Sequence, residues 1–315
     1  MTDRPTVSVL LTTFRRTGAL TRCLDSLRAQ TWPPTQVLVV MRDTDTPTHE
    51  LVAGYRAAHP DFPLATASAH EPGVVAANNV GLPLLTGDVV AFLDDDSTAP
   101  PHWLERLVRH YTDPTVGAVG GRIENYENGR LTCADRALSG KSMRIDRQGR
   151  IHPGQRYAFS GVRTVDHLAG GNMSFRRHLL TACDANLRGH GFRYETDLCL
   201  TAQAAGYRIL LDGDAWNTHT PEPRHGLPNR DDGTGRWHDQ AYNEAYVVAK
   251  HGRTNLLFLL ATLFWRFPLA VLRAARHAEP SRLSAIVGTL RGLAQGLTVG
   301  RTVRKRQLEE IRHGW

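Results

Sequence analysis

Short apolar runs alternate with helical periodicities along the first two-thirds of the chain. The β-rich apolar runs at 6–13, 36–41, 64–67 and 89–93 predict strands of a buried sheet. The segments between them predict helices at 19–30, at 48–59 and after the turn that opens at residue 71. Strands that alternate with helices in this way predict a parallel sheet with right-handed crossover connections.

The alternation continues less regularly after residue 100. The pattern predicts a helix from Pro100 to Tyr111, then a strand at 116–123, a strand fed by the Gly-rich turn within 167–177, a helix at 198–205 and a strand at 207–211. The stretch 124–165 is polar and rich in Gly and Arg, so we expect a variable loop or small hairpins there.

One predicted strand ends in a run of carboxylates. Val89–Leu93 is apolar throughout and is followed directly by Asp94, Asp95 and Asp96. Ligands of open α/β sheets bind beyond the carboxyl ends of the strands. Three adjacent carboxylates repel one another unless a positive group joins them, and hard divalent cations prefer carboxylate oxygens. The run therefore indicates a metal or ligand site, with a solvated acidic turn as the alternative.

The order and spacing of several segments together carry a family resemblance: 7–14, 23–27, 30–31, 78–81, 87–96, 170–175, 195–200 and 205–209. Together they resemble the family 2 glycosyltransferases, which have the GT-A fold. The resemblance covers most of residues 6–220. It implies an inverting transferase that uses a nucleotide-diphosphate sugar and a divalent cation, Mn²⁺ or Mg²⁺. The fold that we expect is a Rossmann-like, mostly parallel sheet flanked by helices, with a C-terminal helical extension.

The resemblance assigns the acidic run to the donor's diphosphate. Asp94 and Asp96 match the ends of the family's Asp-x-Asp motif, so we expect Asp94 at the ribose or the metal and Asp96 at the metal. Asp95 is grouped with the nucleotide-sugar contacts. His219 stands where this family often has a histidine; it is either a third metal ligand, which would favour Mn²⁺, or a histidine at the surface or facing phosphate.

The resemblance also suggests the general base. An inverting displacement needs one carboxylate within reach of the acceptor hydroxyl. The family places it in an acidic pair before a helix, and here that run contains Glu195 and Asp197. We expect Glu195 to be the base, although the family's usual residue is an aspartate, with Asp197 as alternative or support. Both could instead be acids favoured at a helix start by the helix dipole.

The remaining contacts to the nucleotide sugar are expected after the first strands and in Gly-rich turns. By resemblance they are, in chain order, Thr13, Arg15, Asp43, Gly73, Asn78, Asn79, Gly170, Gly171 and Asn172. The loop around Asp43 departs from the family's usual Asp-Asp-Gly-Ser pattern. For Gly73 and the two asparagines, helix capping and packing is the alternative explanation. The small residues at 170–171 let backbone approach a ligand.

The net charge and the cysteines limit the possible partners and the cellular location. The net charge of +7 suits phosphate-bearing ligands or an anionic membrane surface; nucleic-acid binding would explain the charge but none of the acidic motifs, so we expect no nucleic-acid partner. Four scattered cysteines form no Cys-x-x-Cys motif, and residues 1–5 lack a signal-peptide pattern. A reducing, cytoplasmic location is the simplest interpretation.

The composition changes after Pro221, so we expect a catalytic domain at 1–222 and a helical, basic segment at 223–315. A helix is predicted at 237–251, and amphipathic candidates at 255–267 and 284–299 precede the basic cluster 301–306. These candidates are too short or too polar to span a bilayer. They favour peripheral association with the inner face of a membrane. Packing on the catalytic domain or on the partner in a homodimer is the alternative.

We therefore expect an inverting glycosyltransferase of cell-envelope glycan, glycolipid or polysaccharide synthesis, with a carbohydrate or lipid-linked acceptor. A sugar-phosphate nucleotidyltransferase shares the sheet, nucleotide and metal. It would carry a Gly-rich, basic loop after the first strand, and residues 12–16 are not such a loop. A non-catalytic carbohydrate-binding or scaffold protein with a degenerate site is the other alternative, and donor-sugar hydrolysis would separate it from an enzyme.

Overall fold

A ten-stranded sheet organises the N-terminal two-thirds of the protein. The computed structural model describes residues 4–133, 136–222, 233–254 and 282–313. The chain divides into two units, which we describe separately. The first contains residues 1–144, 153–183 and 198–226, and the second contains residues 145–152, 184–197 and 227–315.

The first half of the sheet is parallel and follows the predicted alternation. Its strands lie in the order β3-β2-β1-β4. The elements are β1 (Val7–Thr13), α1 (Thr17–Arg28), β2 (Gln36–Arg42), α2 (Thr46–Ala58), β3 (Leu64–Ala69), α3 (Val74–Gly81), a 3-10 turn η1 (Leu82–Leu84) and β4 (Val89–Leu93). All five residues of β4 are buried, as expected for a strand covered on both faces.

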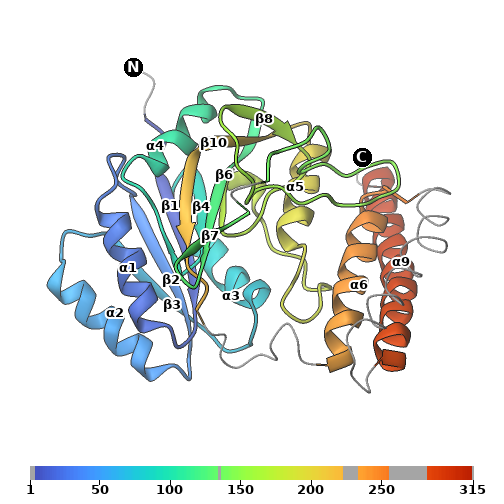
Figure 1. Cartoon of the computed structure of the whole chain (residues 1–315), viewed down its shortest axis with the longest axis horizontal. Helices are drawn as coiled ribbons and strands as arrows, with labels where there is room; N and C mark the ends of the chain where they lie inside the picture. Colours follow the sequence, from blue (N-terminus) through green and yellow to red (C-terminus); the bar gives the residue numbers. More distant parts are fainter. Residues whose placement is uncertain (1–3, 134–135, 223–232, 255–281, 314–315) are drawn as a thin grey trace. The chain divides into compact units, whose positions relative to one another are not determined.

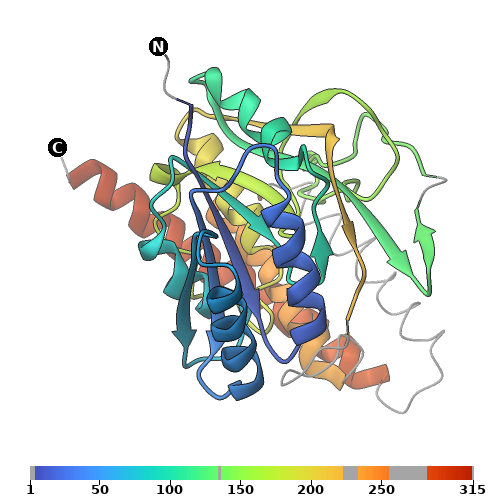
Figure 2. The same cartoon turned by 90° about the vertical axis from the view of Figure 1, so that its left-hand side faces the viewer.

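Helices cover both faces of this half. Alternate strand residues such as Val9, Val39 and Ala91 form one core with the buried sides of α1, α2 and α4 (Trp103–Val108). Figure 2 shows α1 and α2 in front of the strands on this side. Helix α3 packs on the other face, where Gly81 lies against Leu10 and Val40. The strand ends that carry polar residues are thereby fixed at one edge.

The second half of the sheet is mixed. Strand β9 (Asn172–Arg176) runs antiparallel between β4 and β6 (Val116–Glu127), and β6 pairs in parallel with β10 (Arg208–His219). The remaining elements are β5 (Ser97–Thr98), η2 (Arg109–Thr112), β7 (Arg130–Thr132), β8 (Val162–Val165) and η3 (Arg177–Leu179). The short strand β7 forms a small hairpin with β6, as expected in the stretch 124–165, whereas β8 pairs antiparallel with the distant β10.

Several boundaries differ from the sequence prediction, among them the end of β10 and the end of α4. Strand β10 continues to His219 instead of ending at residue 211, because its last residues pair with both β6 and β5. Helix α4 ends at Val108, and the next four residues tighten into the 3-10 turn η2. The pairing that extends β10 joins residues far apart in the chain, so it leaves no local periodicity in the sequence.

Two long helices dominate the second unit. Helices α6 (Gly233–Lys250) and α9 (Arg282–His313) run side by side (Figure 1). The apolar residues predicted in the first of them are buried: Tyr242, Ala245, Tyr246, Val248 and Ala249. The predicted amphipathic helix at 284–299 lies within α9, and the candidate at 255–267 lies outside the described residues. Among the described residues, the helices are too short or too polar to span a bilayer.

Glycines explain why α6 and α9 approach closely. A Cβ atom added to Gly292, Gly296 or Gly300 of α9 would lie 2.2, 2.3 or 2.5 Å from a backbone oxygen of α6. The oxygens belong to His238, Tyr242 and Tyr246. Only glycine leaves room for this contact, so the four-residue spacing of glycines defines the packed face of α9.

Candidate active site

Two carboxylates and an imidazole meet where β4 and β10 end. Asp94, Asp96 and His219 offer ligand atoms that all lie within 4.8 Å of one another. Asp94 and Asp96 follow β4, and His219 is the last residue of β10. Pairing of β10 with β5 places His219 opposite Ser97, the residue after Asp96. The backbone therefore brings this histidine to the acidic run.

The orientation of the His219 ring is fixed by Asn125. His219 Nδ1 lies 2.6 Å from Asn125 Oδ1. The Asn125 amide is itself oriented, since its Nδ2 donates to Glu127 and Thr132. His219 Nδ1 is therefore the protonated nitrogen that donates to Asn125. In the neutral ring, Nε2 is then left with a lone pair, and it faces Asp96 Oδ1 at 3.2 Å and Asp94 Oδ2 at 4.0 Å.

This arrangement fits a divalent cation. The buried Asp96 Oδ1 has no hydrogen-bond donor among the described residues. A neutral imidazole nitrogen and a carboxylate oxygen that face each other are two acceptors, and a cation between them would remove their repulsion. Without a cation the ring must instead be protonated to bond Asp96. Two carboxylates and an imidazole suit Mn²⁺ better than Mg²⁺.

The opposite side of the acidic run is neutralised by the protein. Arg16 Nη1 lies 2.8 Å from Asp95 Oδ1 and 3.1 Å from Asp96 Oδ2. The backbone N–H of Glu222 also donates to Asp96 Oδ2. Burial raises the pKa of Asp95 to about 6, although the charge of Arg16 opposes this shift. Asp95 therefore pairs with Arg16. One oxygen of Asp96 also contacts Arg16, and its other oxygen faces His219.

The turn before β9 supports the acidic run from behind. A Cβ atom on Gly171 would lie 2.6 Å from Asp94 Oδ2, so a side chain at this position would displace the Asp94 carboxylate. The neighbouring Asn172 is fully buried, and its side chain bonds Trp103, Arg122 and Ala215. Asn217 in turn donates to the Gly171 carbonyl. Gly171 thus lies at the site, and the Asn172 side chain is held by the protein around it.

The predicted base lies in the first turn of a helix. Helix α5 (Tyr194–Ala204) begins four residues earlier than expected, so Glu195 and Asp197 are inside it. Asp197 is buried, with Lys250 Nζ 2.9 Å from one oxygen and His251 Nε2 2.7 Å from the other. Glu195 is partly buried and lies about 200° around the helix from Asp197. The protein thus engages both carboxylate oxygens of Asp197, and the assignment of Glu195 as the base stays a prediction.

Comparison with known proteins identifies the family. The family model for glycosyl transferase family 2 matches residues 8–182, which is more than half of the chain. This chain belongs to glycosyl transferase family 2. The matched region includes β1–β4, the acidic run and the turn before β9.

Individual relatives match this chain over different lengths. The glycosyltransferase AglE of Haloferax volcanii is 31% identical over 144 residues, which cover 45% of this chain and 47% of AglE. The chain thus spans about half the length of that relative. The succinoglycan biosynthesis protein ExoM of Rhizobium meliloti is 27% identical over 302 residues, covering 86% of this chain and 90% of ExoM.

A solved structure establishes the fold. The mannosyltransferase PcManGT of Pyrobaculum calidifontis, solved with GDP-Man and Mn²⁺, superposes with a TM-score of 0.58 at 19% identity. The superposition covers 100% of this chain and 88% of that one. The GT-A fold predicted from the sequence is confirmed.

The residues expected at the nucleotide of this family 2 protein follow neighbouring strands. Thr13 ends β1, and Arg15 follows it in a left-handed conformation (φ 56°). Asp45 is fully buried and caps α2 while it accepts the Arg15 N–H. Asp43 instead has 36% of its side chain exposed and lies 2.9 Å from His70 Nδ1, a bond that lowers the pKa of Asp43. Asp43 is thus open to a ligand and Asp45 is not.

Helix α3 carries two of the other predicted contacts. Gly73 precedes its first turn with a φ of 107°. Asn78 is buried, and its Nδ2 has no hydrogen-bond partner among the described residues. Asn79 is engaged with the backbone of Cys183 in both directions. The contacts of Gly73 and Asn78 with a nucleotide sugar stay predictions.

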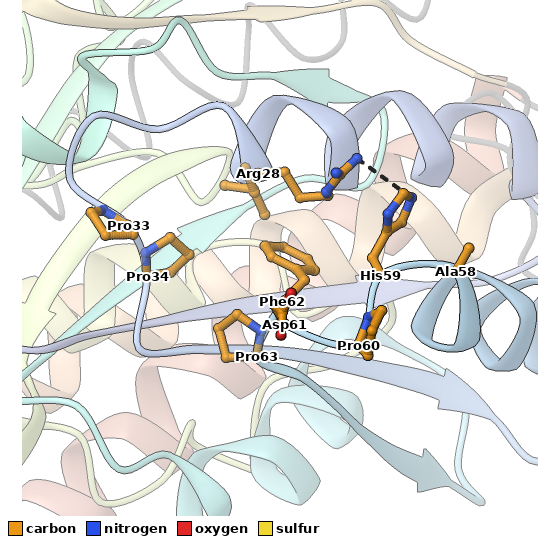
Figure 3. Close-up of a pocket in the computed structure, with 10 residues that line it drawn as sticks. Arg28, Pro33, Pro34, Ala58, His59, Pro60, Asp61, Phe62 and Pro63 are labelled. Atoms are coloured by element: carbon orange, nitrogen blue, oxygen red, sulfur yellow. Dashed lines mark hydrogen bonds between the residues drawn. The ribbon is translucent and has the colours of Figure 1, made fainter.

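A cavity elsewhere in the first unit does not belong to this site. It has a volume of about 450 Å³ and is lined by the end of α1 and by the loops before β2 and β3. Figure 3 shows Phe62 and the prolines Pro33, Pro34, Pro60 and Pro63 around it. Because these loops precede the parallel strands, the cavity lies at the opposite end of the strands from the acidic run.

The sequence did not single out the residues that orient the site. Arg16, Asn125 and Asn217 each contact a predicted residue or its neighbour. Asn125 of β6 and His219 of β10 are 94 residues apart in the chain, and only strand pairing brings them together. Arg16 was adjacent to the selected Arg15, and only the fold decides which of the two arginines faces the aspartates.

Proposed function

We propose that this protein is an inverting glycosyltransferase that moves a sugar from a nucleoside diphosphate sugar to an acceptor hydroxyl with the help of a divalent cation. The observation that carries the proposal is the convergence of Asp94, Asp96 and His219, with the buried Asp96 Oδ1 facing the His219 Nε2. Asn125 fixes the ring in the tautomer that a metal ligand needs. Membership of family 2 supports the same chemistry.

Each residue has a defined part in the proposed reaction. Asp94, Asp96 and His219 would hold the cation, which when bound supplies electrostatic stabilisation of the departing diphosphate. Glu195 takes the proton of the acceptor hydroxyl as that oxygen attacks the anomeric carbon. The attack occurs opposite the leaving diphosphate, so the configuration at that carbon inverts. Asp43 would contact the nucleobase, with His70 beside it.

The donor is found with a binding panel. We expect one nucleoside diphosphate, UDP or GDP in the first instance, to raise the melting temperature only in the presence of Mn²⁺. The same ligand should fail with Asp96→Ala. The Glu195→Gln variant should bind donor and cation normally but release no nucleoside diphosphate. If no nucleotide stabilises the protein with any divalent cation, the transferase proposal is wrong; full turnover by Glu195→Gln would move the base to Asp197.

We further propose that the acceptor belongs to cell-envelope glycan, glycolipid or polysaccharide synthesis. The match to ExoM over most of both chains supports this, since that protein is named for succinoglycan biosynthesis. Glycan and lipid-linked acceptors can be compared by transfer of radiolabelled sugar from the donor that the panel identifies. Transfer to neither class would contradict this part of the proposal.

The exposed face of α9 supports peripheral membrane association. Val287, Leu290 and Leu308 are exposed apolar residues, and Arg301 and Lys305 are exposed cations. Successive members are 3, 11, 4 and 3 residues apart, so all five fall on one side of the helix. Such a face suits an anionic leaflet. We expect co-sedimentation with phosphatidylserine vesicles, lost in Arg301→Glu/Lys305→Glu, and none with phosphatidylcholine alone; equal binding to both would contradict it.

A further inference from the structure

The segment that carries the proposed base is closed by one lysine. We call residues 184–197 the base segment. Lys250 Nζ lies 2.7 Å from Asp184 Oδ2, at the start of the segment, and 2.9 Å from Asp197 Oδ2, at its end. The lysine side chain is only 9% exposed. One buried ammonium group therefore joins both ends of the base segment.

Helix α6 also contacts the base segment between its ends. Asn243 accepts the N–H of Arg188 and donates to its carbonyl. Glu244 lies 3.6 Å from Arg193. Tyr246 donates to Asp184, and His251, directly after α6, lies 2.7 Å from Asp197. One side of α6 thus holds the base segment from its first residue to its last.

The backbone of the base segment shows why it needs this support. Gly189, Gly191 and Arg193 all have positive φ angles, of 58°, 67° and 80°. Arg193, which immediately precedes α5, is not a glycine. A left-handed residue with a side chain is unfavourable and persists where the surroundings enforce it. The contacts from α6 supply that enforcement at the point where the catalytic helix begins.

We propose that Lys250 is a positioning residue of the transferase. By clamping Asp184 and Asp197 it fixes the first turn of α5, and Glu195, on the other side of that turn, is thereby presented to the acceptor at a constant place. The inference rests on the proposed function, because it takes Glu195 as the general base. It makes helix α6 part of the catalytic machinery.

The test compares three lysine variants. Lys250→Met removes the clamp, Lys250→Arg keeps its charge, and Lys141→Met removes an exposed lysine as the matched control. The assay is the Mn²⁺-dependent release of nucleoside diphosphate from whichever UDP- or GDP-sugar wild type uses fastest. Amide hydrogen exchange is followed in 184–197, with β1 as reference.

We expect Lys250→Met to lower kcat about 10- to 100-fold with KM for the donor within about twofold, since a misplaced group loses rate and not donor binding. Exchange in 184–197 should accelerate while β1 stays protected. Lys250→Arg should restore most of kcat, and Lys141→Met should match wild type. A folded Lys250→Met protein with wild-type kcat, beside an inactive Glu195→Gln variant, overturns the positioning role and leaves the proposed function intact.

Two further outcomes are separated by design. If Glu195→Gln is itself fully active, the base assignment fails, whatever Lys250→Met does. If Lys250→Met does not fold, the double variant Lys250→Met/Asp184→Asn decides, because it removes one buried charge of each sign and leaves Asp197 paired with His251. A kcat loss of tenfold or more in the double variant supports the clamp, and a wild-type kcat overturns it.

Discussion

Aspartates gather around a positive centre in each of the two units, but the centres differ in origin. In the second unit, Asp184 and Asp197 share the ammonium of Lys250, which the chain itself supplies. At the acidic run, Arg16 neutralises Asp95 and one oxygen of Asp96, while the other oxygen faces Asp94 and His219 without a donor among the described residues. A built-in cation stabilises a fold, whereas an incomplete cluster is completed by a ligand.

The difference predicts opposite responses to the loss of one charge. Removing a partner from the completed cluster leaves buried carboxylates uncompensated, so stability suffers. Removing a carboxylate from the incomplete cluster relieves repulsion, so function suffers and stability does not. The comparison can therefore be broken or sharpened by single substitutions, beginning with the acidic run.

Asp96→Ala should produce the largest effect. We expect turnover to fall about 10²- to 10³-fold or more, because the variant would lose the proposed cation that stabilises the leaving diphosphate. The melting temperature without metal should stay unchanged or rise, since Arg16 keeps Asp95 as a partner. Donor turnover and differential scanning fluorimetry with and without Mn²⁺ measure both. Asp113→Ala, at a surface loop of the same unit, is the control. A strongly destabilised Asp96→Ala protein would show that this cluster, too, is structural.

Lys250→Met should act on stability. We expect about 3–5 kcal/mol of destabilisation, the usual result of leaving one side of a buried ion pair unpartnered. Urea unfolding followed by circular dichroism measures it. The matched variant Lys305→Met should change stability by less than about 0.5 kcal/mol, because its pair with Glu309 is exposed. If Lys250→Met were as stable as Lys305→Met, the Lys250 cluster would not stabilise the fold, and its contrast with the acidic run would disappear.

These two clusters also show what the sequence could reveal. The acidic run was predictable because it follows an apolar strand directly, so local order alone places Asp94–Asp96 at the sheet edge. The clamp was not predictable, because Asp184, Asp197 and Lys250 are joined only by the tertiary fold. The periodicity of 237–251 indicated its buried apolar side but could not assign a partner to Lys250.

The helices of the second unit also show which features the sequence reveals and which it hides. The stretch 284–299 was correctly predicted as helical, but its most informative feature was the four-residue repeat of Gly292, Gly296 and Gly300. That repeat is visible in the sequence and defines the side of α9 that contacts α6. The start of α5 at Tyr194 was missed because Gly191 and Arg193, both left-handed, precede it and weaken any helical pattern.

Gly296→Leu sharpens the comparison, since it loosens α6 without changing any charge. The new side chain would meet the backbone of Tyr242 and Tyr246, and we expect about 1–3 kcal/mol of destabilisation from overpacking. Urea unfolding again measures it, and Ala294→Leu on an exposed position of the same helix should be nearly neutral. Wild-type stability of Gly296→Leu would mean that α6 and α9 do not pack as described.

Acid below about pH 4 should weaken the built-in cluster, and this effect should be the smallest of those predicted. Burial alone would raise the pKa of Asp184, but the hydrogen bonds from Lys250 and Tyr246 lower it to about 2, from an ordinary value of 3.8. Because the folded-state pKa is depressed, this carboxylate stabilises the fold above about pH 4, and the contribution is lost as the pH falls towards 2. The difference corresponds to about 2 kcal/mol. Unfolding free energies at pH 5 and pH 2.5 should therefore diverge less in Asp184→Asn than in wild type, and an identical pH dependence in the two proteins would show that Asp184 is not held as a buried anion.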